Sequence, residues 1–156
     1  MADRYGVSAS FGGNVSRENW DKFLKRLAGG WNFEINDGRV VTSDGEASYD
    51  DYTELVHAAW DSDISVSLDV DGDHGYPSEV HVWFPGMEAP ERATGAGDSK
   101  AAIDIADLIN LAAAGLTLNM VISKYEKFDR EPDPLMIDGA AATDDDLEFV
   151  EEDDDA

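Results

Sequence analysis

Apolar and polar residues alternate along residues 4–11, which is the period of a half-buried strand. Ser16 then stands where it can cap a helix, and apolar residues follow at the spacing of one helical face. These residues are Trp20, Phe23, Leu24 and Leu27. The pattern predicts a strand, and then a helix that stops at Gly29 and Gly30, because glycine commonly follows a last helical turn.

The next apolar positions predict a hairpin and a second helix. The stretches WNFEI and RVVT flank NDG, which is typical of two strands joined by a tight turn. Ser48 and Asp51 have the spacing of a capping box, and they open a helix with one apolar face. That face carries Tyr52, Leu55, Val56 and Ala59.

Two further alternating stretches, ISVSLDV and EVHVWF, predict two strands with a hairpin loop between them. A third helix is expected from about residue 99 to residue 114, and Gly115 would end it. Residues 116–123 alternate again, which predicts a strand, with a helix that continues past Gly115 as the alternative. Residues 129–143 show no period and are expected to be irregular.

This order of elements predicts an α+β fold, a two-layer sandwich. Each predicted strand has one apolar and one polar side, so a mixed or antiparallel sheet with helices on one face is expected. The order through residue 70 is βαββαβ, that of a ferredoxin-like unit, and a further β-α-β follows. We expect a single domain over residues 1–128, with the irregular segment and an acidic tail over 129–156.

The charge of the chain adds a second prediction. The formal net charge is −24, which repels nucleic acid and anionic membranes and attracts basic proteins and cations. Residues 144–156 hold nine acids and no base, so this tail is expected to be disordered when alone. Basic residues gather instead in the first predicted helix, at Arg17, Lys22, Lys25 and Arg26.

Composition also excludes several classes of protein. The chain has no cysteine, so disulfides, thiol catalysis and sulfur-bound zinc are absent. No apolar run approaches the ~18 residues of a membrane span, and the N-terminus does not read as a signal peptide, so we expect a cytoplasmic protein. The histidines, His57, His74 and His81, show no catalytic partner pattern. We therefore expect no enzyme and no cofactor, while the oligomeric state stays open.

The loop DVDGDHGYPSE, residues 69–79, resembles a calcium-binding loop in its alternating carboxylates. An EF-hand needs glycine at position six and glutamate at position twelve, but these positions hold His74 and Val80. A plain hairpin loop is therefore expected. A weak divalent-cation site remains the alternative, with the candidate ligands Asp69, Asp71, Asp73 and Glu79.

Two acidic segments are candidates for binding a partner. The outward face of the second helix carries a stripe of Asp50, Glu54, His57 and Asp61, about 16 Å long and flanked by Asp51 and Asp63. The tail begins with three acids and adds apolar anchors. Its candidate residues are Asp144, Asp145, Asp146, Leu147 and Phe149.

These features favour an acidic binding protein that inhibits or regulates a basic, nucleic-acid-binding protein by imitating nucleic-acid charge. Inhibitors made by phages or mobile elements often have this size and charge. The alternative is an ordinary domain of a halophilic organism, whose acidic surface serves solubility, and 23 Asp against 12 Glu with five Lys fit it. The two hypotheses differ in distribution, because a binding surface is polarised and a solvation coat is even.

Overall fold

The computed structural model describes residues 5–27, 30–42, 45–72, 78–94 and 103–148. It has the strands β1 (Tyr5–Val15), β2 (Phe33–Asn36), β3 (Arg39–Thr42), β4 (Gly45–Ala47), β5 (Ser65–Val70), β6 (Glu79–Trp83), β7 (Glu91–Thr94), β8 (Leu135–Ile137) and β9 (Ala140–Ala141). The helices are α1 (Arg17–Arg26), α2 (Tyr49–Asp61), α3 (Ile105–Ala113) and α4 (Leu118–Tyr125), with 3₁₀ turns η1 (Glu126–Asp129) and η2 (Asp144–Leu147).

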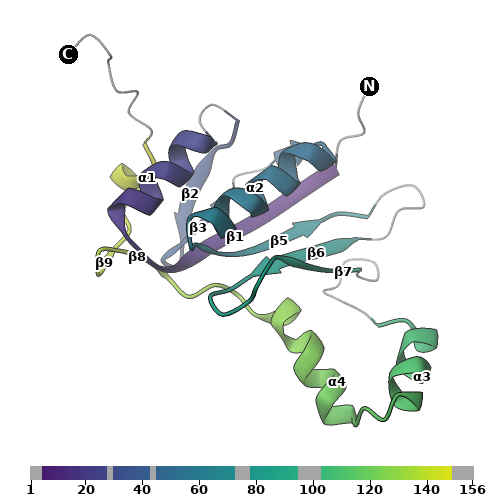
Figure 1. Ribbon diagram of the computed structural model, residues 1–156. Helices are drawn as coiled ribbons and strands as arrows, with labels where there is room; N and C mark the ends of the chain where they lie inside the picture. The colour runs from purple at the N-terminus through teal and green to yellow at the C-terminus, as the bar shows by residue number, and fades with distance from the viewer. Residues whose placement is uncertain (1–4, 28–29, 43–44, 73–77, 95–102, 149–156) are drawn as a thin grey trace.

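The strands form an antiparallel sheet in the order β2-β3-β1-β5-β6-β7 (Figure 1). The predicted α+β class with an antiparallel sheet is therefore confirmed. β1 is the central strand, and its alternation is the predicted one, with Val7, Ala9 and Phe11 buried. It runs on to Val15, beyond the stretch 4–11 over which the sequence predicted a strand.

Helices α1 and α2 cover one face of this sheet and enclose the main core (Figure 1). Both begin where predicted, because Ser16 and Ser48 accept hydrogen bonds from the backbone N–H groups of Asn19 and Asp51, at 3.1 and 3.3 Å. Phe23 of α1 packs on Phe11 of β1, with ring centroids 5.2 Å apart. The predicted apolar faces of both helices are thus buried against the sheet.

A smaller core lies on the opposite face of β6. Trp83 belongs to the main core, whereas Val80 and Val82, which alternate with it, pack with Ala93 and with Phe128 of η1. The sheet is therefore covered on both faces, because the 3₁₀ turn η1, which follows α4, packs on this second face of β6. The sequence did not predict this, because residues 85–98 and 126–134 have no regular period.

Two short strands alter the predicted order of elements. β4 pairs with the start of β1 and stands between β3 and α2, so the predicted βαββαβ order is not reproduced as written. β7 adds an edge strand after β6, where no strand was expected. Strands of three and four residues carry too few alternations for a periodic signal.

The strand predicted at residues 116–123 is wrong, because this segment forms helix α4. Gly115 has φ 89° and ends α3, with the N–H of Leu116 bonded to the Leu111 carbonyl at 3.1 Å. Thr117 then caps a new helix by accepting from the N–H of Met120 at 3.3 Å. The alternative of one helix continuing past Gly115 is also incorrect, since a stop and a new start separate α3 from α4.

The segment expected to be irregular contributes to the core instead. β8 pairs in parallel with residues 13–15 of β1, and it buries Leu135 and Ile137 completely or nearly so. The start of the acidic tail is ordered as well, since residues 144–147 form η2. The rest of the tail, residues 149–156, lies outside the described residues.

Truncation of Leu135, the fully buried residue of β8, should destabilise the whole domain. Leu135→Ala leaves a cavity at a site with no exposure, and it should lower the free energy of unfolding by about 2–5 kcal/mol, measured by urea denaturation. The neighbouring Met136→Ala, at a half-buried position, is the matched control and should cost clearly less. Equal effects would mean that β8 only borders the core.

Candidate functional site

The acidic stripe of α2 faces solvent as the sequence predicted. Asp50, Glu54, His57 and Asp61 are exposed, while Tyr52, Leu55 and Val56 of the same helix are buried. Asp50 and Asp51 lie in the first helical turn, where carboxylates interact favourably with the helix dipole. Asp63 follows the helix with φ 57°, a conformation that aspartate tolerates better than most residues.

The middle and end of this stripe are neutralised by α1. The Arg26 guanidinium donates to both carboxylate oxygens of Glu54, at 2.5 and 3.1 Å, and to Asp61 Oδ2 at 2.5 Å. These hydrogen bonds hold the pKa of the Glu54 carboxyl below its ordinary value. Lys22 adds a bond to the Asp61 carbonyl at 3.2 Å. Arg26 and Lys22 of the basic cluster therefore face the α2 stripe, so this part of the cluster is not a separate surface.

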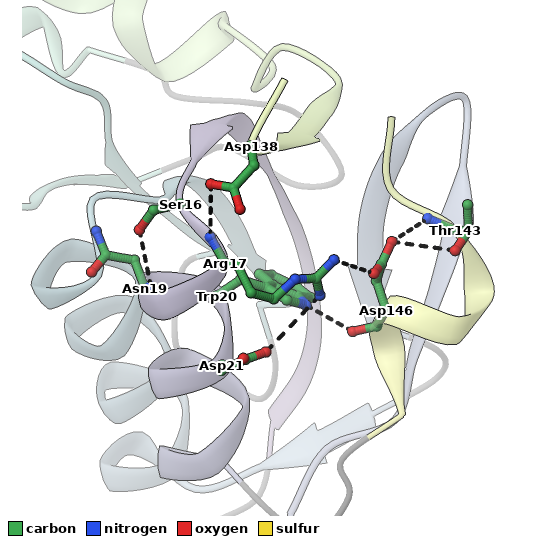
Figure 2. Close-up of polar contacts among 8 residues, drawn as sticks. All are labelled: Ser16, Arg17, Asn19, Trp20, Asp21, Asp138, Thr143 and Asp146. Carbon is green, nitrogen blue, oxygen red and sulfur yellow. Dashed lines mark hydrogen bonds and ion pairs between the residues drawn. The ribbon is translucent and has the colours of Figure 1, made fainter. Parts of the chain in front are cut away.

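The start of the tail is tied to α1 through Asp146 (Figure 2). Its carboxylate accepts from the N–H of Thr143 and from Arg17, both at 2.7 Å, and its carbonyl accepts from the Trp20 indole N–H at 2.7 Å. These donors, Thr143 first and Arg17 second, lower the pKa of the Asp146 carboxyl. Asp146 thus has a structural role that its place in an acidic run did not indicate.

The other candidate residues of the tail differ in their surroundings. Leu147 packs against the main core of the protein, so it anchors η2 to its own chain. Asp144 and Asp145 are exposed. Phe149 lies outside the described residues, so its expected role as an anchor stays a prediction.

The remaining exposed candidate acids lie at two ends of the layer formed by α1 and α2, which is called the helix layer below. Ala47, just before α2, pairs with Tyr5 at the start of β1, whereas Ser65, just after α2, pairs with Gly12 near its other end. The α2 end carries Asp50 and Asp51. The η2 end carries Asp144 and Asp145, because η2 docks on α1 beside the far end of β1. The two pairs of acids therefore lie toward opposite ends of β1.

A polar cluster that the sequence analysis missed joins α2 to β6. Glu79 accepts a hydrogen bond from the Tyr52 hydroxyl at 3.2 Å, lies 3.2 Å from His81 Nε2, and pairs with Arg92 at 3.4 Å. Burial lowers the pKa of His81, against the opposing effect of Glu79. The signal was present, since Glu79 and His81 stand two apart and hence on one face of a strand.

Among the candidate calcium ligands that the structure describes, Asp69 and Glu79 lie on opposite faces of the sheet. Val70, on the core face of β5, pairs with Glu79, so Glu79 points toward α2, where Tyr52 bonds it. Asp69 is exposed and lines a pocket on the opposite face with Ser8 and Ser67. Asp73 lies outside the described residues. Within the described ranges, no group of three or more metal-ligating side chains is present.

Comparison with known proteins gives no matching family model, no matching curated protein and no matching solved structure. In the part of the chain that the structure describes, no helix combines the length and apolarity that a bilayer crossing requires. We therefore infer function from the charges and surfaces of the chain itself.

The lowered pKa of Asp146 makes the docking of η2 sensitive to acid. Its contribution to stability is present above the ordinary aspartate pKa of about 3.9 and should be lost as the pH falls through the lowered pKa. We expect the indole N–H signal of Trp20 to shift in this range. Asp146→Asn should remove the pH dependence, whereas Asp145→Asn, one exposed residue away, should leave it unchanged.

Calcium should not bind at the 69–79 loop, because Asp69 and Glu79 lie on opposite faces of the sheet. A titration followed by the amide signals of Asp69, Asp71 and Glu79 should show no saturable binding tighter than about 10⁻⁴ M. Saturation below that concentration would require the β5–β6 hairpin to rearrange, and it would contradict the observed register.

Proposed function

We propose that the chain is a non-enzymatic acidic binding protein, which inhibits or regulates a basic, nucleic-acid-binding protein by covering its nucleic-acid surface. One observation supports it most: the chain uses its own cations internally. Within the described residues, five of them form ion pairs with its own carboxylates: Arg17, Arg26, Arg39, Arg92 and Lys127. The remaining field is strongly negative, so a basic surface is the complementary partner.

The helix layer is the face that we assign to this partner. Its α2 end and η2 end lie toward opposite ends of β1, so the two groups of carboxylates are well separated along this face. Between them Arg26 neutralises Glu54 and Asp61, so the negative charge is concentrated at the two ends. We further propose that β2-β3-β1-β5, α1 and α2 form a ferredoxin-like unit, which holds the two ends at a fixed separation.

The assignment predicts which acids matter for binding. The protein captured from the native host at low salt should be displaced from a labelled duplex by the chain, measured by fluorescence anisotropy. Asp50→Lys with Asp51→Lys should weaken this competition several-fold, because individual exposed charge pairs contribute ~0.2–1 kcal/mol. The loss should appear mainly as slower association, and binding should weaken steeply as salt rises.

Two matched variants control this experiment. Glu34→Lys with Glu88→Lys makes the same change in net charge outside the α1–α2 layer and outside α3–α4, and it should reduce competition clearly less. Asp50→Asn with Asp51→Asn separates loss of charge from reversal. If both reversal pairs act equally, or if the chain folds only near molar salt, the acidic surface serves solvation, as in the halophilic alternative.

A further inference from the structure

The consecutive helices α3 and α4, which a short turn joins and which are called the α3–α4 hairpin below, carry large apolar side chains that the described part of the chain leaves exposed. α3 has no buried residue, and Val121 is the only buried residue of α4. In Figure 1 the hairpin projects beyond β7, away from α1 and α2. The uncovered side chains are Ile105 (71% exposed), Leu118 (69%), Ile109 (63%), Met120 (56%) and Ile122 (50%).

Four of these five residues follow the helical period, whereas Met120 lies on another side of α4. Ile105 and Ile109 are four residues apart on α3, and Leu118 and Ile122 are four apart on α4, so each pair lies on one helical face. Helices of nine and eight residues are marginal in water without packing. Two such helices with apolar stripes therefore gain stability from a cover over these faces.

The distribution of charge indicates what kind of surface can cover these apolar side chains. Residues 108–123 contain no charged residue, although 29% of the chain is charged and its net charge is −24. A basic protein would find no carboxylate along this stretch, and an anionic membrane would find no base. The same stretch of a second copy, in contrast, would bring no charges of equal sign together, because residues 108–123 carry none.

We propose that α3–α4 is a self-association surface, on which the same hairpin of a second copy packs to form a four-helix contact. Such an isologous arrangement places the same patch of each copy against the other, as in most two-fold dimers. Acids of the two bodies that lie farther apart than about 8 Å are largely screened at physiological salt. The inference is independent of the proposed function, and it leaves the helix layer free.

Sedimentation velocity on the full chain, over a concentration series at about 0.15 M and about 1 M salt, tests the inference. We expect a reversible dimer that becomes tighter at high salt, because screening reduces repulsion between two acidic bodies. Ile109→Asp and Ile122→Asp should each raise the dimer Kd at least tenfold. Asn110→Asp and Ser123→Asp add the same charge to the same helices beside the stripes, and they should raise it by less than about threefold (~0.6 kcal/mol).

Three outcomes would overturn the inference. The wild-type chain could associate more weakly than a Kd of about 1 mM in both salts. The matched variants could weaken the dimer as much as the stripe variants, which would make charge, and not the stripes, the cause. The dimer could also loosen at high salt, which would assign it to ion pairs elsewhere. Far-UV circular dichroism confirms that each variant is folded. High salt should weaken binding to a basic partner but tighten the dimer, so failure of one proposal can be distinguished from failure of the other.

Discussion

Strand β1 and the close approach of the C-terminal segment to it are the constraint on which the rest of the structure depends. β1 is hydrogen-bonded to β3 and β5 along the sheet, to β4 at its start and to β8 at its end. At Gly12 a Cβ atom would lie 1.7 Å from the Asp133 carbonyl oxygen, and the N–H of Gly13 donates to that same carbonyl at 3.0 Å. Glycine is therefore required where β1 receives the returning chain.

The features that could be predicted from the sequence are those with a long period or a local cap. The alternation of β1, the caps Ser16 and Ser48 and the exposure of the α2 stripe all follow from residues close in sequence. β4, β8 and β9 are too short for a period, and the alternation at residues 116–123 was misleading because Thr117 starts a helix. The Arg26 pairs and the docking of Asp146 depend on how distant elements pack, which no local pattern contains.

The internal ion pairs change the meaning of the net charge. Arg17 and Arg26 each connect α1 to another element, and both have a raised pKa from the carboxylates that they bond. The protein is therefore strongly acidic without being uniformly so, since the middle of its helix layer is balanced and the ends are not. The stretch 108–123 of the α3–α4 hairpin, which carries no charged residue, is the opposite extreme. A single chain thus separates an electrostatic face from an apolar one, with the sheet between them.

The parallel pairing of β8 with β1 also constrains when the fold can be completed. The strand that closes the end of β1 comes long after it along the chain, so it is synthesised long after β1 itself. Until then the buried positions of Leu135 and Ile137 are empty, and the Gly12 end of the central strand lacks its last neighbour. Contacts of such long sequence separation form slowly, because a large loop must close first. The sheet is therefore completed only once β8 has been synthesised, and the nascent chain exposes an unpaired edge until that moment.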